Sequence, residues 1–370
     1  MCYQVPPLPA SPRLRVKPLP TPPLRLCVSA LNFSAVDKAR DKAESPMNLS
    51  VIILTYNEER HIQRCIELAR PLGASVFVVD CFSTDQTVEL ARVAGAQVVQ
   101  HAWPGNQADQ LNWALDNLPI HTEWALRLDA DEYLRPALIE EIRAKLDTLP
   151  ADINGVAFHL ERFFMGRLIR RGIPDVTIVR LFRFGKARCE RRLMDERMVL
   201  LEGRDTTFAG SFVDHNLNDL AWWTQKHLGY AIREAADMLD IEYGLFDRSN
   251  AEAEGRVVSG ESGVGSCERN AEAQRRRGGE GLCEQAAAKR RMKLKYARAP
   301  LFWRALAYFC MRYFVCGGFL EGREGFMWHF FQGLWYRMLV DARIWEIKRD
   351  SGGDREKMLE LLRTRFGLRI

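Results

Sequence analysis

Short apolar runs alternate with amphipathic segments from residue 48 onward. The apolar runs are rich in Val, Ile and Leu, which predicts buried strands, and the segments between them have helical periodicity. The predicted strands span residues 49–55, 74–80, 96–100 and 123–128, and the predicted helices span residues 59–70, 86–94 and 108–117. This alternation indicates βαβ units with right-handed crossovers, and therefore an α/β fold with a mostly parallel sheet flanked by helices.

Polar side chains follow three of these strands at the point where each strand ends. Parallel strands end along one edge of a sheet, and open α/β sheets bind ligands in the crevice outside that edge. In strand order the residues are Thr55, Asn57 and Glu58, then Asp80, then Asp129 and Asp131. The last two form an Asp-x-Asp pair that can hold one Mg²⁺ or Mn²⁺ while water and substrate phosphates complete the coordination shell. The alternative is a solvated turn or a helix cap.

Three segments in this order and spacing resemble the family 2 glycosyltransferases of GT-A fold. They are Thr-Tyr-Asn-Glu at 55–58, Val-Asp-Cys-Phe-Ser-Thr-Asp-Gln-Thr at 79–87, and Leu-Asp-Ala-Asp-Glu at 128–132. The resemblance covers about residues 48–245, and the rest of the chain resembles bacterial lipopolysaccharide-core and exopolysaccharide transferases. It implies an inverting, metal-dependent enzyme that moves a sugar from a nucleotide-sugar donor to a membrane-linked glycan in cell-envelope polysaccharide biosynthesis.

The resemblance also implies roles for the residues at the strand ends. Thr55, Asn57 and Glu58 would contact the nucleotide, and Asp80 would bind its base or ribose. A carboxylate at a strand end can accept such hydrogen bonds, although Asn57 and Asp80 could instead only shape turns. Asp85 is expected to cap the next helix, with a ligand contact as the alternative.

The predicted metal ligands are Asp131, with Asp129 helping through water or the sugar, and a late histidine. In related GT-A enzymes such a histidine completes the metal shell, and His215 is placed for this role. The alternative is a hydrogen-bonded structural histidine.

Sugar transfer with inversion needs a base for the acceptor hydroxyl. Family members place an acidic base after the strand predicted at 176–183, and we expect Glu196 in this role, with Asp195 second. The neighbouring Arg197 would keep a carboxylate ionised, and the alternative is a surface charge run. Arg180 and Arg183 alternate along the strand and are expected on its solvated face, with contact to a phosphate as the alternative.

Composition excludes some functions. The chain has 370 residues, of which 47% are hydrophobic and 27% charged, and its net charge of +5 is too small to indicate nucleic-acid binding. Its nine cysteines have no C-x-x-C spacing, which argues against a zinc ribbon or a thioredoxin-like site and fits a reducing compartment. Cys310 and Cys316 are expected to be small core residues.

The chain divides into four predicted parts. Residues 1–46 are Pro-rich, lack the apolar core of a signal peptide and are expected to be disordered, with Met47 as an alternative start of translation. Residues 47–248 form the predicted transferase domain. Residues 249–290, rich in Gly, Ser, Glu and Arg, are expected to be a disordered insertion, and residues 291–370 a helical membrane-associated region.

Two apolar segments at residues 301–320 and 326–340 approach the length of a membrane span. Arg312 lies in the middle of the first segment, where insertion costs roughly 2.5–3.5 kcal/mol. Gly317 and Gly318 are expected to break the helix, and Tyr, Trp and Arg alternate as in interfacial helices. We therefore expect peripheral or re-entrant association with the cytoplasmic face of the bacterial inner membrane, with a core helix pair as the alternative.

Two functional alternatives remain open. The Gln-x-x-Arg-Trp signature of processive synthases is absent, which favours the addition of one sugar per encounter. A sugar-nucleotide nucleotidyltransferase would need a Gly-rich basic loop after the first strand, where this chain has Tyr-Asn-Glu-Glu. A non-catalytic nucleotide-binding scaffold would keep the same fold and the same strand-end residues.

Overall fold

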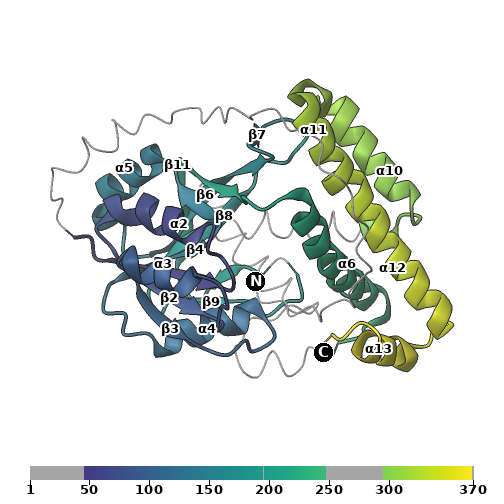
Figure 1. Ribbon diagram of the computed structural model, residues 1–370, viewed down its shortest axis with the longest axis horizontal. Helices are drawn as coiled ribbons and strands as arrows, with labels where there is room; N and C mark the ends of the chain where they lie inside the picture. The colour runs from purple at the N-terminus through teal and green to yellow at the C-terminus, as the bar shows by residue number, and fades with distance from the viewer. Residues whose placement is uncertain (1–45, 195, 247–294, 369–370) are drawn as a thin grey trace, which may run out of the picture.

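The computed structural model describes residues 46–194, 196–246 and 295–368. The segments expected to be disordered, 1–46 and 249–290, lie almost wholly outside the described residues. Figure 1 shows a sheet with helices on both sides and, next to it, a layer of helices built mainly from the C-terminal part of the chain. The predicted α/β class is confirmed.

The described strands form a mixed sheet in the order β3-β2-β1-β4-β8-β6-β11-β5, and β7 pairs with β6. Their bounds are β1 Leu49–Thr55, β2 Ser75–Asp80, β3 Gln97–Gln100, β4 Trp124–Asp129, β5 Glu132–Leu134, β6 Ile153–Phe164, β7 Arg167–Ile169, β8 Thr177–Arg183 and β11 Arg204–His215. The strands β3, β2, β1 and β4 are parallel, as predicted, and β8 runs antiparallel between β4 and β6. A short hairpin of β9 (Ala187–Cys189) and β10 (Met198–Leu200) stands apart from the sheet.

Helices cover both faces of the sheet because the central strands are apolar on both sides. In β1 the side chains of Val51 and Ile53 belong to one core, and those of Ile52 and Leu54 belong to the other. The first core packs against α2 (Ile62–Ala69), α3 (Thr87–Val93) and α5 (Pro136–Lys145), and the second against α4 (Gln107–Asn117). Complete burial of β1 is typical of a parallel central strand.

The C-terminal helices have a core of their own. The long helix α6 (Leu220–Tyr243) packs against α12 (Tyr336–Ser351) and α13 (Arg355–Thr364), and Figure 1 shows α6 and α12 side by side. Before α12 come α10 (Trp303–Cys310), the π-helical turn η3 (Met311–Val315), the 3₁₀ turn η4 (Gly318–Glu321), α11 (Gly322–Trp328) and the π-helical turn η5 (His329–Trp335).

The two predicted apolar segments form different structures and differ in burial. The second ends in α12, where Val340 is buried in the helical core as the core-helix alternative predicts, whereas Phe326 and Phe330 near its start are exposed. The first forms α10 and η3, and the chain breaks at Gly317, which has φ +72°, as expected. Within the described ranges, no helix combines the length and the apolar character needed to cross a bilayer. The expectation for Cys316 was wrong, because this thiol is exposed, and Cys310 is only half-buried.

Candidate active site at the carboxyl edge of the sheet

Three neighbouring parallel strands end together at one edge of the sheet. Thr55 at the end of β1 is in register with Asp80 at the end of β2, and Leu54 is in register with Asp129 at the end of β4. The two aspartates are therefore two strand spacings apart, about 10 Å. The predicted convergence of polar side chains at this edge is confirmed for these strand ends.

Hydrogen bonds tie the loops after β1 and β2 together. Asn57, with φ +54°, accepts a bond from the backbone N–H of Thr84 (2.9 Å) through Oδ1, and its own N–H donates to Ser83 Oγ (2.8 Å). Asp85 Oδ1 accepts a bond from the N–H of Thr87 (3.0 Å), the first residue of α3. The N-cap position itself is occupied by Gln86, so Asp85 supports the start of the helix from one residue before the cap. Asn57 thus shapes the loop, and its contact with a nucleotide stays a prediction.

Asp80 is fully buried and surrounded by donors. Its Oδ1 accepts bonds from the hydroxyls of Thr55 (3.0 Å) and Ser83, and its Oδ2 accepts bonds from the N–H of Ser83 (2.9 Å) and Nε2 of Gln100 (3.1 Å). A base or ribose would have to displace one of these donors to reach the carboxylate. The observed role of Asp80 is to brace the loop after β2.

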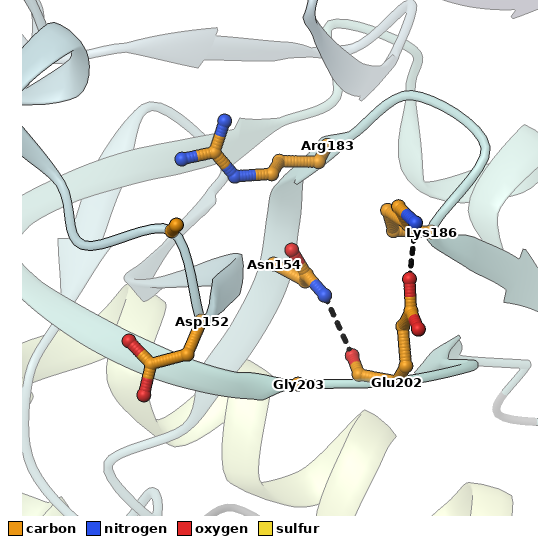
Figure 2. Close-up of a pocket in the computed structure, with 7 residues that line it drawn as sticks. Asp152, Asn154, Arg183, Lys186, Glu202 and Gly203 are labelled. Atoms are coloured by element: carbon orange, nitrogen blue, oxygen red, sulfur yellow. Dashed lines mark hydrogen bonds and ion pairs between the residues drawn. The ribbon is translucent and has the colours of Figure 1, made fainter.

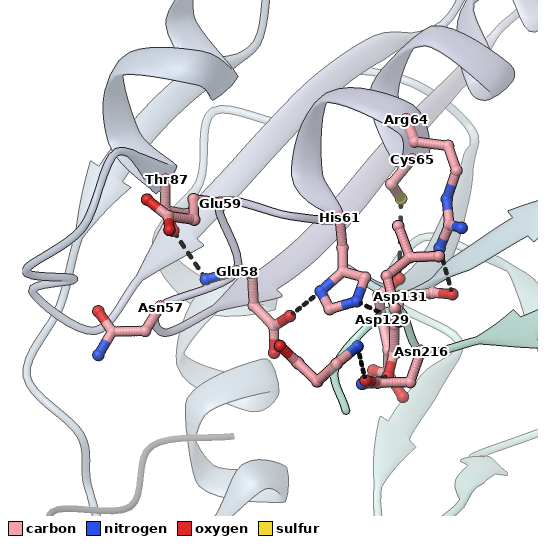
Figure 3. Close-up of polar contacts among 12 residues, drawn as sticks. Asn57, Glu58, Glu59, His61, Arg64, Cys65, Thr87, Asp129, Asp131 and Asn216 are labelled. Atoms are coloured by element: carbon pink, nitrogen blue, oxygen red, sulfur yellow. Dashed lines mark hydrogen bonds and ion pairs between the residues drawn. The ribbon is translucent and has the colours of Figure 1, made fainter. Parts of the chain in front are cut away.

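The side chain of Glu58 is directed inward (Figure 3). Its Oε2 lies 2.7 Å from Nδ1 of the buried His61, whose Nε2 accepts a bond from the N–H of Leu217 (2.8 Å). One helical turn later, Arg64 donates to the carbonyl oxygens of His215 (2.6 Å) and Asp131 (3.3 Å). The bonds of Arg64 fix the end of β11 beside the Asp-x-Asp segment. The bond to His61 occupies one carboxylate oxygen of Glu58, which was predicted to contact the nucleotide.

Asp129 lies among cationic and amide donors. Its carboxylate oxygens are 3.5 Å from guanidinium nitrogens of Arg127 and Arg180, and Gln107 at the start of α4 donates to it at 3.3 Å. Burial alone would raise the pKa of Asp129, but the charges of Arg127 and Arg180 lower it to about 2. Asp129 is therefore an anion throughout the physiological pH range.

Arg180 is not on a solvated strand face, which corrects the sequence-based expectation. It is buried and forms an ion pair with Glu132, whose Oε2 also accepts the N–H of Asp129 (3.0 Å). Burial raises the pKa of Glu132, and the Arg180 contact opposes that rise. Arg183 is partly buried instead, with its guanidinium over the ring of Trp124 and paired with Glu123 at the opposite edge of the sheet.

Asp131, Asp214 and His215 meet where β11 passes the Asp-x-Asp segment. Asp131 Oδ2 accepts a bond from Asn216 (3.0 Å), and burial together with the charge of Asp131 raises the pKa of Asp214 to about 6. The ring of His215 stacks on Phe163 with 4.7 Å between centroids, and burial together with the charge of Arg64 lowers its pKa to about 4. His215 is therefore neutral at pH 7.

The donor set at this edge fits a cation that shares its shell with a substrate. No group of three or more His, Cys, Asp or Glu side chains able to hold a metal ion occurs in the part of the chain that the structure describes. Asp129, Asp131 and His215 thus do not form a closed metal site. Mg²⁺ and Mn²⁺ are commonly held by one or two carboxylates plus substrate phosphates and water, and the ionised Asp129 with the nearby Asp131 meets that requirement.

The loop between β9 and β10 brings Glu196 to the same region, whereas Asp195 lies outside the described residues. Asn106, the N-cap of α4, donates to the carbonyl oxygen of Arg192 (2.7 Å), and Asp109 on α4 pairs with Arg191 (3.2 Å), so the start of α4 anchors this loop. Burial lowers the pKa of Arg127, but nearby negative charges outweigh this effect and raise the pKa. The largest contribution comes from Asp129, and Glu196 makes a smaller contribution. Glu196 is therefore within electrostatic reach of the arginine that contacts Asp129.

Sequence reasoning did not find Arg127 and Gln107 as parts of this site, and it considered Arg180 only as an alternative phosphate contact. The available signal was the spacing of Arg127 and Asp129, which puts both side chains on one face of β4.

A separate hollow of about 340 Å³ is lined by Asp152, Asn154 and their neighbours (Figure 2). It lies where β6 and β11 begin, at the opposite edge of the sheet, and contains none of the predicted site residues.

Residues 50–195 match the family model described as glycosyl transferase family 2. Over 94 residues the chain is 38% identical to uncharacterized glycosyltransferases of Rickettsia typhi and Rickettsia prowazekii. Each match covers 25% of this chain and 31% of the relative, so the matched stretch spans about a third of the curated relatives' length.

Among solved structures, S. aureus TarS 1-349 is 23% identical, covers 41% of this chain and 43% of that chain, and has a TM-score of 0.29. Glucosyl-3-phosphoglycerate synthase from Mycobacterium tuberculosis, in complex with Mn²⁺, UDP and glucosyl-3-phosphoglycerate, is 23% identical with 37% and 50% coverage and a TM-score of 0.26. These TM-scores are too low for residue roles or ligands to be transferred to this chain.

Proposed function

We propose that this chain, whose residues 50–195 match the glycosyl transferase family 2 model, transfers a sugar from a nucleotide-sugar donor to a membrane-linked glycan with inversion at the anomeric carbon. The observation that supports this proposal best is the meeting of Asp80, Asp129 and Asp131 at one sheet edge, with the charge of Glu196 close to Arg127. This arrangement of carboxylates and guanidinium groups suits an anionic donor that is bound together with a divalent cation.

The residues have distinct tasks in this proposal. Arg127 and Arg180 keep Asp129 ionised, and Asn216 holds Asp131 in place. A divalent cation bound at the two aspartates would neutralise the diphosphate as it leaves. Glu196 takes the proton from the acceptor hydroxyl while that oxygen bonds to C1 and the C1–diphosphate bond breaks.

A membrane-held acceptor is proposed because the catalytic edge faces the helical layer. Phe164, at the carboxyl end of β6, packs against Trp223 of α6 and Trp328 of α11, with centroids 5.8 Å and 5.3 Å apart. Residues 302–330 of that layer expose ten large hydrophobic side chains, so we expect a lipid-borne glycan to reach the candidate site from this direction. The resemblance to lipopolysaccharide-core and exopolysaccharide transferases supports the same class of acceptor.

The test compares Glu196→Gln, Asp131→Asn and a control, Glu202→Gln, which changes an exposed carboxylate at the opposite edge. The assay measures nucleoside diphosphate release from a panel of nucleotide sugars with Mn²⁺ and a membrane extract as acceptor. Loss of a general base lowers turnover by about 10²–10⁴-fold, so we expect E196Q to lose turnover but to bind donor normally. D131N should weaken donor binding and need more Mn²⁺, and E202Q should match the wild type.

The outcomes separate the possible errors. If E196Q keeps wild-type turnover, the base assignment is wrong while the transferase assignment stands. If the wild type binds donor but releases no diphosphate with any acceptor extract, the scaffold alternative is favoured. If D131N leaves both donor affinity and Mn²⁺ requirement unchanged, Asp131 is not a metal ligand.

A further inference from the structure

An exposed apolar surface covers the segment from α10 to η5. Ten of the seventeen large hydrophobic side chains exposed in the described residues fall within residues 302–330. We call this surface the apolar face, and it consists of Phe302, Trp303, Leu306, Met311, Phe314, Val315, Phe319, Leu320, Phe326 and Phe330. Trp303 is 72% exposed and Val315 is 81% exposed. Concentration of such residues in one segment marks an interaction surface, whereas single exposed residues do not.

The same segment directs charged residues inward. Arg304 is 5% exposed and pairs with the fully buried Asp341. Arg312, also 5% exposed, donates to the carbonyl oxygen of Gly172 (2.6 Å), and Glu321 accepts the N–H of Arg171 (2.9 Å). A helix facing water has the reverse arrangement, with charged residues outside and apolar residues inside. The surroundings that suit this segment are therefore apolar.

Cationic side chains border the apolar face. The β6–β7 hairpin and the loop that follows β7 contribute the exposed Arg167, Arg170 and Arg171, and α11 contributes the exposed Arg323. The hairpin is held against α11 by Arg167, which is 3.4 Å from Glu324. Figure 1 shows β7 next to α11. Apolar residues with a basic border are typical of segments that lie in the interface of an anionic bilayer.

We propose that the apolar face docks onto the surface of an anionic lipid bilayer and enters one leaflet without crossing it. The continuous helix of α10 and η3 has thirteen residues, about 20 Å in length, against roughly 30 Å for the hydrocarbon core. The break at Gly317 turns the chain back, and the basic border meets the lipid headgroups. A second copy of the chain is a poorer occupant, because a two-fold interface brings the arginines of one border close to those of the other.

If the chain has the proposed function, docking in this way also explains how a lipid-linked acceptor would reach the candidate site. Trp328 of α11 packs on Phe164 at the carboxyl edge of the sheet, so an aromatic contact joins the docked segment to the edge that carries the candidate site. The bilayer that the apolar face enters would then present a lipid-linked acceptor to the candidate site.

The experiment is vesicle co-sedimentation of the full chain, which is independent of catalysis. The vesicles contain phosphatidylcholine with or without phosphatidylglycerol. The variants are Val315→Glu and Phe314→Glu on the apolar face. The matched control is Val93→Glu on α3, since Val93 is 79% exposed and lies outside the face. We expect the wild type and V93E to sediment with phosphatidylglycerol vesicles, and each face variant to partition at least about tenfold less.

Two results would overturn the proposal. One is wild-type protein that stays in the supernatant with phosphatidylglycerol vesicles at low salt. The other is a wild-type protein that is dimeric in sedimentation equilibrium while V315E is monomeric. This result would assign the apolar face to a second copy of the chain. Circular dichroism of each variant checks folding. Vesicle binding without any transferase activity would leave the docking surface in place and reject only the proposed function.

Discussion

At the residue scale, the position of Arg180 shows how a strand pattern can mislead. Alternation along β8 suggested a solvated face, but β8 lies between β4 and β6 in the interior of the sheet order. A central strand has neighbours on both sides and covered faces, so a polar residue on it must find a buried partner. Arg180 finds Glu132 and Asp129, and so becomes part of the candidate site.

Arg180→Gln should lower the free energy of unfolding by about 3–5 kcal/mol, because it leaves the buried Glu132 without its cation. Adding Glu132→Gln to the same chain should recover part of this loss, since no unpaired carboxylate remains. Urea unfolding measures both variants. Arg204→Gln, which breaks an exposed pair with Asp152, is the control and should change little. A loss below about 1 kcal/mol for R180Q would show that the pair does not stabilise the fold.

At the element scale, the turns around β7 decide how the sheet meets the helical layer. Gly166 (φ +78°) lies in the β6–β7 turn, and Gly172 (φ +68°) lies after β7. A Cβ atom at Gly166 would have no atom within 4 Å. At Gly172 it would lie 2.5 Å from the carbonyl oxygen of Arg312 and 2.5 Å from the ring of the buried His329. The backbone of the loop after β7 thus packs directly on the C-terminal helices.

Gly172→Ala and Gly166→Ala form a matched pair for this contact. Both substitutions place a side chain at positive φ, which costs about 1 kcal/mol or more. Only G172A also forces η3 and His329 away, and overpacking of this kind adds roughly 1–3 kcal/mol. Thermal unfolding should therefore rank the proteins as wild type, G166A and G172A in falling stability. Equal losses in the two variants would mean that the loop after β7 and the helices are not tightly packed.

At the scale of the whole molecule, α6 connects the end of β11 to the helical core through aromatic stacking. The ring of His227 lies 3.5 Å from that of Trp223 between centroids and 5.3 Å from that of Tyr336 on α12. Its Nδ1 donates to the carbonyl oxygen of Trp223 (2.8 Å), and burial lowers its pKa from 6.5 to about 4. The helical layer therefore keeps this histidine neutral when the protein is folded.

Stability should fall in mild acid because the unfolded chain protonates His227 more readily than the folded one. The contribution of His227 is complete above pH 6.5 and is lost as the pH falls toward 4, for a total of about 3 kcal/mol. Urea unfolding at a series of pH values measures the free energy of unfolding of the wild type and of His227→Gln, and the difference between the two should show this loss. The exposed His121→Gln is the control and should follow the wild type. Parallel curves for wild type and H227Q between pH 4 and 6.5 would contradict the prediction.

The sequence by itself determined the first four strands, their parallel direction and the sheet edge at which Asp80, Asp129 and Asp131 lie. Strand periodicity and crossover handedness are local properties of the chain, so they can be read without tertiary contacts. The roles of Glu196 and of the metal ligands are still predictions from family resemblance.

Only the tertiary structure decided which polar groups are already occupied and which surfaces are left open. Asp80 has partners from the ends of β1 and β3, and the carboxylate of Glu58 is held by the buried His61. Arg180 is enclosed by neighbouring strands, and residues 302–330 expose large apolar side chains. These outcomes depend on which elements pack together over long sequence separations. Periodicity gives the faces of an element, whereas the packing of the whole chain decides what each face meets.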